Sequence, residues 1–535
     1  EQYFDAFRSH QDVANPSDLV SLLEGLWPVA LSEHGGSGDV AQVRKKLFNA
    51  TGFMQVMKDV VWKLDRFGPK ELPRLLGALH IMTWSDRHLF KLAETQVVRH
   101  MPGIQLEELP RLVTSYVEVQ CGSRMLFEEF VRRCSQAAGR FDGSTLADLV
   151  AVFSRGPHKP KAFLVEVGPF VVDSLPVLSS AQLASIAEAY ARWPRDVPEE
   201  LAEGLAALLC KNEGSLVKEM SPGQLVALLR AFVLWKKRRR SEQGTINLSL
   251  ADHIFRLAAE PLLQGRKQWT PDQAATAFWA FAKMTAVPEA LFKGLYQELV
   301  RGAEKLPEPA LAACLLVSAR GAAGQIQILR GSSEDSVNEL DDEDDADDSG
   351  PSASSAEALC DLQLLDASEE RVRDVVTGFD TRDLTSVVLA YSMSHAGSPE
   401  LFAVLHKACL DRCRMLAMEQ VATLGWSFAT IRLGSSFFRE AQFDVLEKMN
   451  QLTIPGVCDV LWAYCASRHR DAHFFKALLS VLVPSRIAGD PRCALLYPAL
   501  LDIRLHLPEM DPEGLERYMG YSREEFHRCQ LAALP

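Results

Sequence analysis

Apolar residues recur along this chain at a spacing typical of helices. In 270–284 (TPDQAATAFWAFAKM) four apolar residues fall on one helical face that ends at Phe281. Thr270 and Gln273 at the start of the segment have the spacing of a capping box. A second apolar stripe begins at Phe292, eleven residues after Phe281. Together these features predict a helical hairpin.

The same frame recurs many times, and we number each copy from the residue in the place of Phe281, which we call position zero. Position zero is filled by Leu79, Tyr116, Phe153, Tyr190, Phe232, Phe281, Tyr391, Phe428 and Tyr464. These residues follow one another at 36 or 37 residues, apart from steps of 42, 49 and 110. In each copy positions −7 and −4 are apolar and position −1 is small or Val, and weaker copies begin at Leu19, Leu311 and Cys493. We therefore predict an all-α fold, a right-handed α-solenoid of about a dozen helical hairpin repeats of roughly 37 residues.

Composition divides the chain into five segments. Residues 1–64 predict an N-terminal helical cap with a Gly-rich loop, and 65–330 hold helical repeats. Residues 331–358 form a serine- and acid-rich insertion that has too few apolar residues to fold. Repeats resume over 359–490. Residues 491–535 predict a C-terminal helical cap, because the end of a solenoid needs a polar face.

The negative charge of the chain is concentrated in one place. The formal net charge is −13, and 334–348 carries ten acidic residues and no basic one, so the rest of the chain has a net charge of −3. A nearly neutral body lacks the general basic character of many nucleic-acid-binding proteins. The eleven cysteines show no disulfide spacing, which favours a reducing compartment. No apolar run reaches the length of a membrane span, so we expect no membrane insertion.

No catalytic constellation is evident. The glycines of 34–38 (HGGSG) lack the Gly-Lys-Ser/Thr that completes a phosphate-binding loop, and no nucleophile elbow or paired-carboxylate motif is present. His406, Cys409 and Cys413 share a helical face but complete no zinc spacing. We therefore expect a non-enzymatic protein with no cofactor, no metal and no small-molecule substrate.

The strongest binding candidate is a run of five cations after a predicted helix end. It consists of Lys236, Lys237, Arg238, Arg239 and Arg240. Such a run binds phosphates or an acidic protein surface. The alternative is a solvated loop that pairs transiently with the acidic segment.

Exposed positions of the first helices are the second set of candidates. Helical geometry places −6, −5, −2 and +2 outside the apolar stripe, and basic residues there are Arg74, Arg111, Arg155, Arg192 and Lys283. Their variation from repeat to repeat fits base-by-base reading of RNA, and it equally fits a weakly constrained surface. Three tryptophans at −2 allow either stacking on bases or packing between repeats.

Those tryptophans belong to a short sequence motif that occurs three times. Trp279–Phe281, Trp426–Phe428 and Trp462–Tyr464 resemble the first-helix signature of octotricopeptide-like repeats and of FAST-kinase-like organellar helical-repeat proteins. The resemblance covers most of 65–490. Many relatives end in a RAP domain, an endonuclease-like module that is not recognisable in 491–535.

The resemblance implies a location and a function. It points to an RNA-binding protein of the mitochondrion, or alternatively of the chloroplast. Such a protein acts in RNA processing, stability or translation, in some cases on the ribosome. The alternative function is a protein–protein scaffold or accessory subunit of an organellar complex, such as a mitoribosome or a respiratory assembly. Its partners are therefore organellar RNA, subunits of a larger complex, or both.

Overall fold

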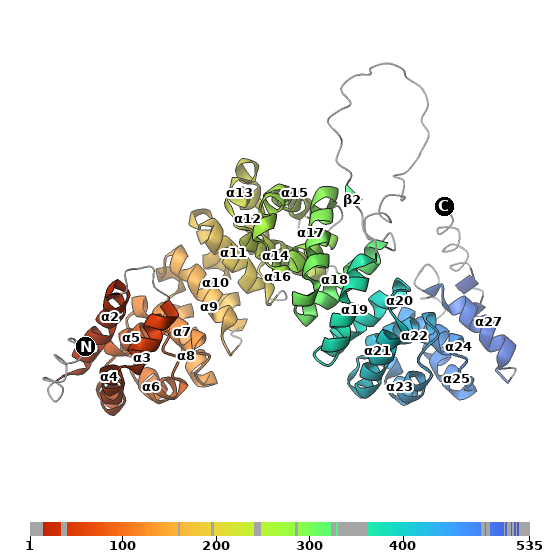
Figure 1. Ribbon diagram of the computed structural model, residues 1–535, viewed down its shortest axis with the longest axis horizontal. Helices are drawn as coiled ribbons and strands as arrows, with labels where there is room; N and C mark the ends of the chain where they lie inside the picture. The colour runs from red at the N-terminus through yellow and green to blue at the C-terminus, as the bar shows by residue number, and fades with distance from the viewer. Residues whose placement is uncertain are drawn as a thin grey trace, which may run out of the picture. The chain divides into compact units, whose positions relative to one another are not determined.

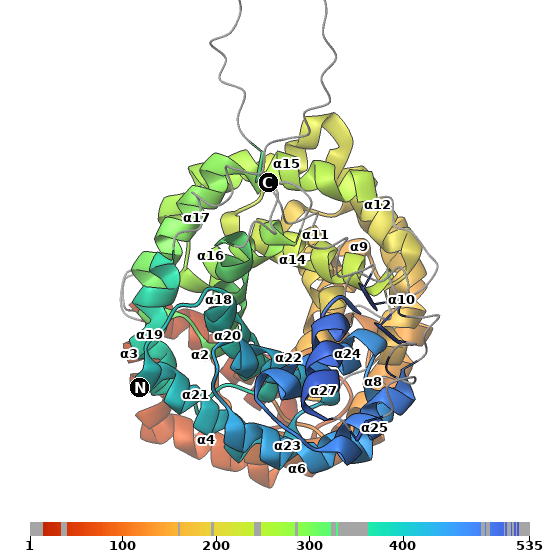
Figure 2. The same cartoon turned by 90° about the vertical axis from the view of Figure 1, so that its right-hand side faces the viewer.

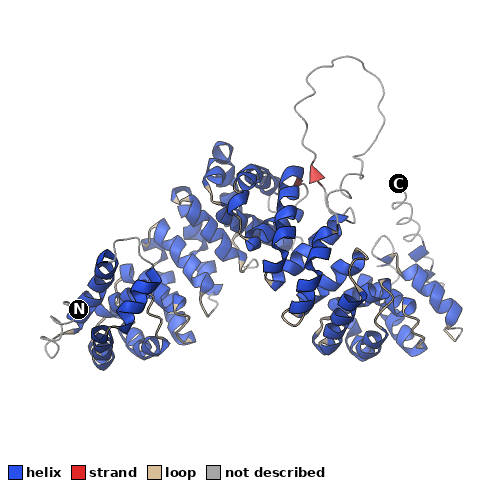
Figure 3. Ribbon diagram, viewed as in Figure 1, coloured by secondary structure: helices blue, strands red, loops and turns tan. Residues whose placement is uncertain are grey.

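The chain folds as helical hairpins stacked in series (Figures 1 and 3). The computed structural model describes residues 14–33, 40–158, 161–193, 197–239, 248–283, 287–322, 328–329, 362–482, 487 and 493–507, with short pieces between 509 and 523. Among these residues the strands are limited to β1 (Val287–Pro288) and β2 (Ile328–Leu329), a two-residue parallel pair. The predicted all-α solenoid is confirmed. The chain divides into unit 1 (Glu1–Pro261) and unit 2 (Leu262–Pro535), which we describe separately.

Unit 1 contains two rows of helices. The first helices of successive repeats contact one another in an inner row: α2 (Pro16–Glu33), α5 (Glu71–Ile81), α7 (Leu109–Glu118), α9 (Gly143–Arg155), α11 (Ser180–Ala191) and α14 (Pro222–Arg239). The second helices form an outer row: α4 (Thr51–Trp62), α6 (Arg87–His100), α8 (Arg124–Gln136), α10 (Lys161–Ser174) and α12 (Glu199–Cys210). Three further helices are α3 (Val40–Asn49), α13 (Ser215–Glu219) and α15 (Leu248–Gln264), and the last contains the boundary between the units.

Unit 2 repeats this arrangement. Its inner row is α16 (Pro271–Ala282), α18 (Glu308–Ala322), α20 (Thr381–Met393), α22 (Met418–Thr430), α24 (Ile454–Ala466) and α27 (Leu496–His506). Its outer row is α17 (Glu289–Gly302), α19 (Gln363–Val375), α21 (Pro399–Asp411), α23 (Ser435–Lys448) and α25 (Ala472–Val481). Within each unit the first helices lie inside the second helices (Figure 2). The helices α18 and α27 confirm two of the weaker repeat copies.

Position zero is the centre of each repeat core. All nine residues predicted there are at most 2% exposed. Four of them are tyrosines, and the other five are Phe or Leu. Each tyrosine donates its hydroxyl hydrogen to a backbone carbonyl of the preceding outer helix. The bonds are Tyr116 to Phe90 (3.1 Å), Tyr190 to Leu164 (2.8 Å), Tyr391 to Leu365 (2.8 Å) and Tyr464 to Phe438 (3.0 Å). Each bond spans 26 residues, so the tyrosine joins one repeat to the next.

The turn after a first helix has a repeated geometry. The residue at +4 adopts a left-handed conformation in five repeats: Thr83, Gln120, His395, Arg432 and Arg468. The next residue donates its N–H to the carbonyl of position zero, for example Leu433 to Phe428 at 2.8 Å. This is the Schellman arrangement that ends many helices. It turns the chain sharply from the inner to the outer row.

The predicted capping box at Thr270–Gln273 is confirmed, and the same Ser/Thr-x-x-Gln spacing forms a box at the start of two other first helices. At Thr270–Gln273 and Ser179–Gln182 both reciprocal bonds are present. At Ser221–Gln224 the serine N–H donates to the glutamine side chain at 2.8 Å, and the glutamine N–H donates back to the serine hydroxyl at 3.4 Å. Each box starts a first helix eleven residues before position zero, which fixes the phase of the apolar stripe.

Two features depart from the simple repeat. The helix α13 is inserted between α12 and α14, and it accounts for the longer step between Tyr190 and Phe232. The helix α14 continues to Arg239, so the prediction that a helix ends before the cationic run is wrong. Lysine and arginine are good helix formers and are favoured at a helix C-terminus, where they complement the helix dipole. The loop 34–38, the residues 240–247 and the acidic run 334–348 lie outside the described residues.

Candidate nucleic-acid interface

Four of the predicted basic residues of unit 1 lie on or next to its inner row and are paired with carboxylates. Glu24 on α2 binds Arg74 on α5, with Nη2 and Oε2 2.5 Å apart, and Arg111 on α7, with Nη2 and Oε1 3.5 Å apart. The hydrogen bond from Arg74 to Glu24 raises the pKa of this guanidinium. One carboxylate therefore connects three successive first helices.

A glycine makes room for this connection. Gly77 lies on α5, and a methyl group built there would be 2.0 Å from Nε of Arg111. The Arg111 side chain therefore crosses α5 over Gly77 to reach Glu24. The position taken by a side chain in other repeats is here taken by an arginine from the next helix.

The remaining predicted arginines of unit 1 are also paired. Arg155 lies 3.3 Å from Glu118, and Arg192 lies 3.1 Å from Glu188. Arg192 also donates to the carbonyl of Ser154 at 3.2 Å. These side chains are 40–48% exposed, so each pair contributes only about 0–1 kcal/mol. From α2 to α11 these predicted arginines thus carry compensated charge, and phosphate binding to them would have to displace carboxylates.

The cationic run is described only in part. Lys236 is half-buried on α14. Lys237, Arg238 and Arg239 belong to the same helix, but their side chains lie outside the described residues, as does the whole of Arg240. In unit 2, Lys283 is exposed at the C-cap of α16. The binding role of these cations stays a prediction.

The inner row of unit 2 has a different surface, which we call the inner face of unit 2. It consists of positions −5 and −2 of five successive first helices, and all ten side chains are half-buried. At −2 they are Trp279, Leu316, Leu389, Trp426 and Trp462. At −5 they are Thr276, Ala313, Ser386, Thr423 and Asp459. The face therefore combines an apolar row with a row of small, mostly polar side chains one helical turn away.

Two of the tryptophans are neighbours. The rings of Trp426 on α22 and Trp462 on α24 have centroids 6.5 Å apart and an interplanar angle of 33°. Packing between repeats, one of the two roles considered for these residues, is confirmed for this pair. Because both side chains are half-buried, each also keeps an accessible part.

The row at −5 supplies hydrogen-bonding groups. The hydroxyls of Ser386 and Thr423 donate to the carbonyls of Arg382 (3.0 Å) and Glu419 (2.8 Å) one turn back. By helical spacing these residues lie on the same side of the helix as the −2 residues. Asp459 is desolvated and lies near the charge of Glu419, and these two effects raise its pKa to about 7.

The described His, Cys, Asp and Glu side chains form no metal site. Within the described ranges no cluster of three or more His, Cys, Asp or Glu side chains has the geometry of a metal site. Every cysteine that the structure describes is a free thiol, and burial raises the pKa of Cys134 and of Cys409 to about 12. His406 binds the hydroxyl of Ser436 at 3.2 Å and packs edge-on against Phe428. No described helix has the length and apolar character needed to cross a membrane.

Comparisons with known proteins identify no family. No family model matches the chain, and no curated protein matches it. Among solved structures, it aligns with a chain from a homology model of the full-length AP-3 complex in an intermediate open conformation. That alignment has 11% identity and a TM-score of 0.27, and covers 98% of this chain and 94% of the other.

A second alignment is with the crystal structure of the pentatricopeptide repeat protein PPR10 from maize. It has 13% identity and a TM-score of 0.17, and covers 97% of each chain. Such low scores carry no argument about function. The chain is a helical-repeat protein whose two units have different inner rows.

Proposed function

We propose that the protein binds single-stranded RNA along the inner face of unit 2, without catalysing a reaction. The observation that supports this most is the pairing, once per repeat, of an apolar or aromatic side chain at −2 with a small, mostly polar side chain at −5. Because its repeat motif resembles the first-helix signature of organellar helical-repeat proteins, we propose that the protein acts in RNA processing, stability or translation in a mitochondrion or chloroplast.

The chemistry of a nucleobase matches this pairing. A base has an apolar face, which stacks on aromatic or aliphatic side chains, and a polar edge, which forms hydrogen bonds. Positions −5 and −2 are three residues apart, so they lie on the same side of the helix one turn from each other. A base stacked on Trp426, for example, would present its edge to Thr423.

The spacing of Trp426 and Trp462 supports the same proposal. A planar base between two rings needs about 7 Å, twice the van der Waals separation of about 3.5 Å. The observed distance between the ring centroids is 6.5 Å. In this proposal a base enters when the two half-buried rings turn parallel and face each other across about 7 Å.

Phosphate contacts contribute less in this proposal than stacking does. Arg74, Arg111, Arg155 and Arg192 of unit 1 are paired with carboxylates, and the chain outside the acidic run is nearly neutral. Few released counterions mean a shallow dependence of affinity on salt. The proposed RNA affinity should therefore fall less steeply with salt than that of a strongly basic RNA-binding protein.

The test compares tryptophans in two places. The full chain and its Trp426→Ala and Trp462→Ala variants are titrated against fluorescein-labelled 20-nucleotide poly(U), poly(A) and poly(C) RNA. Each substitution should weaken binding by about 5- to 100-fold, because one stacked base contributes about 1–3 kcal/mol. Trp62→Ala is the matched control, since Trp62 is 81% exposed at the end of α4 in unit 1. Unchanged affinity in both inner-face variants would exclude this site.

A protein partner is the second candidate for the same face. Leu316 and Leu389 lie in the −2 row, and apolar side chains of this kind also receive the apolar stripe of another protein. In that case the labelled RNAs should not bind to the wild type. Crosslinking with organelle extract should then recover a protein that is lost in Trp426→Ala and retained in Trp62→Ala.

A further inference from the structure

A groove lies on the outer row of unit 1. It has a volume of about 840 Å³ and lies between α8 and α10. Its α8 side runs from Arg124 to Gln136, and twelve residues of helix rise about 18 Å. The groove is thus long enough to receive several turns of a further helix.

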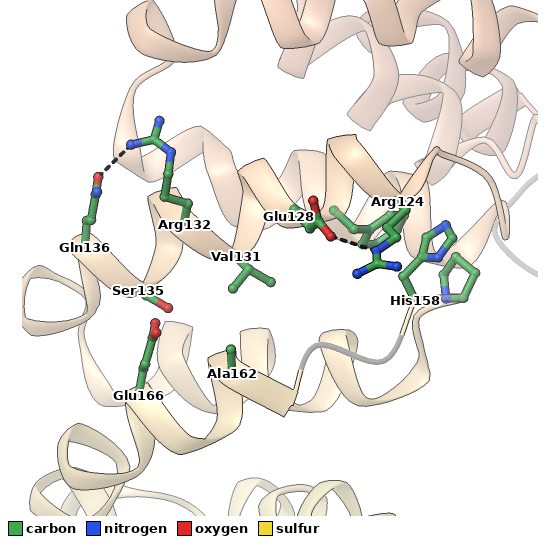
Figure 4. Close-up of a pocket in the computed structure, with 11 residues that line it drawn as sticks. Arg124, Glu128, Val131, Arg132, Ser135, Gln136, His158, Ala162 and Glu166 are labelled. Carbon is green, nitrogen blue, oxygen red and sulfur yellow. Dashed lines mark hydrogen bonds and ion pairs between the residues drawn. The ribbon is translucent and has the colours of Figure 1, made fainter.

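The middle of the groove is apolar. Val131 of α8 and Ala162 of α10 line it there, whereas Phe127 of α8 is 2% exposed and its ring packs against His158, with centroids 5.3 Å apart. Figure 4 shows Val131 and Ala162 pointing toward each other across the gap. Alanine is too small to close the space between the two helices at this level. Apolar side chains of a partner would therefore lose water here against an apolar wall.

One end of the groove is acidic. Figure 4 shows the oxygen atoms of Ser135 and Glu166 facing each other at that end. The Ser135 hydroxyl is buried from solvent and has no hydrogen-bond partner in the described part of the chain. The Glu166 carboxylate likewise makes no hydrogen bond or ion pair with a described residue. These two groups accept hydrogen bonds from a cation.

The arginines of the groove are already engaged on their own helix. Arg124 binds Glu128 with Nε and Oε1 2.7 Å apart, and Arg132 binds Glu129 with Nη2 and Oε1 2.5 Å apart. At the other end His158 forms a hydrogen bond with the carbonyl of Gly122 at 3.1 Å. The charge that the groove leaves uncompensated is therefore the negative charge of Glu166.

We propose that this groove binds an amphipathic helix of a protein partner, with apolar side chains against Val131 and Ala162 and a lysine or arginine at Glu166. Helices bind such grooves through apolar anchors spaced by three or four residues. The basic residue fixes the direction of the helix, because it fits one end of the groove alone. The site belongs to another unit and another row than the proposed RNA site, so it goes beyond that proposal and is tested independently of it.

The experiment uses the full chain and two synthetic probes. Both are fluorescein-labelled 18-residue Leu/Ala helical peptides with leucines three and four residues apart, and they differ only in carrying two lysines or two glutamates at one end. Fluorescence anisotropy should show the lysine peptide binding about tenfold more tightly than the glutamate peptide. Glu166→Lys should reverse this preference, whereas Glu203→Lys, at an exposed glutamate of α12, should leave it unchanged.

A second pair of variants tests the apolar wall. Ala162 is exposed on α10, so Ala162→Trp fills the groove without disturbing the core, and it should reduce lysine-peptide binding at least about tenfold. Ala207→Trp, at an exposed alanine of α12, is the matched control and should bind as the wild type does. Equal binding of the lysine peptide to the wild type and to Ala162→Trp would overturn the proposal. So would an absence of binding by the wild type, or a preference that Glu166→Lys does not change.

Discussion

The tyrosine hydroxyls at position zero offer a direct test of how one repeat is joined to the next. Tyr391 is buried on α20, and its hydroxyl donates to the carbonyl of Leu365 on α19 at 2.8 Å. Burial raises the pKa of this tyrosine, so the group stays a neutral donor. Tyr391→Phe removes the hydroxyl and keeps the ring. Phenylalanine is the natural residue at position zero in several other repeats.

The magnitude follows from what is lost and what remains. Leu365 lies inside α19, so its carbonyl keeps its helical hydrogen bond in the variant. The loss is therefore one neutral, buried hydrogen bond, about 0.5–1.5 kcal/mol. For a unit of this size that corresponds to a fall in Tm of about 2–4 °C per kcal/mol. Tyr464→Phe should behave alike, because its hydroxyl bond to Phe438 has the same 26-residue spacing.

The assay combines global and local readouts. Thermal unfolding followed by circular dichroism gives the change in Tm. Amide hydrogen exchange then shows whether α19, which holds the acceptor of Tyr391, loses protection more than α23, which holds the acceptor of Tyr464. In Tyr464→Phe the order should be reversed. If both variants melt with the wild type and neither helix loses protection, the hydroxyl bonds do not join the repeats and the reasoning is wrong.

Three further predictions address single residues. Because burial and Glu419 raise the pKa of Asp459 to about 7, the folded state holds its proton more tightly than the unfolded state. The wild type should then lose stability as pH rises from about 4 to about 7. At pH 8 Asp459→Asn should be more stable than the wild type by about 1–2 kcal/mol. The pKa shift alone corresponds to about 4 kcal/mol, and the partial exposure of Asp459 reduces this value. Denaturation at pH 4 and pH 8 checks this, and an equal difference at both would contradict it. Arg432→Gly should raise stability by about 1 kcal/mol, measured by urea unfolding, because Arg432 has a φ of 56°. Gly77→Ala should abolish the coupling between Arg111 and Glu24 in a double-mutant cycle, and a coupling of about 0.2–1 kcal/mol that persists would show that Arg111 does not need the glycine.

The repeat frame could be predicted from the sequence because the core obeys one rule in every repeat. An aromatic or leucine at zero, apolar residues at −7 and −4 and a small residue or Val at −1 all serve the same packing. The prediction that Tyr190 and Phe428 are anchors is confirmed by their complete burial. The end of α14 differs from the prediction because lysine and arginine extend a helix well, so a run of charged residues does not by itself mark a loop.

The surface was less predictable than the core. The sequence places Arg74 and Arg111 outside the apolar stripe, but their common partner Glu24 is 50 and 87 residues away, and no local spacing indicates it. The helical frame likewise places Trp426 at −2 without showing how much of it a neighbouring helix covers. Asp459 is the residue whose character changes most, because its raised pKa depends on desolvation by packing and on Glu419 of another helix.

The two inner rows carry different side chains on the same repeat frame. At −2, unit 1 has Gly77, Thr114, Ala151, Glu188 and Arg230, whereas unit 2 has a row of Trp and Leu. The core positions beneath are equally buried in both units, so folding does not require this difference. In unit 1 Glu24 binds Arg74 and Arg111 across repeats, and in unit 2 the apolar side chains remain partly accessible. Accessible apolar surface costs free energy in water unless a partner covers it. For this reason we assign ligand binding on the inner row to unit 2 and a structural role to the ion pairs of unit 1.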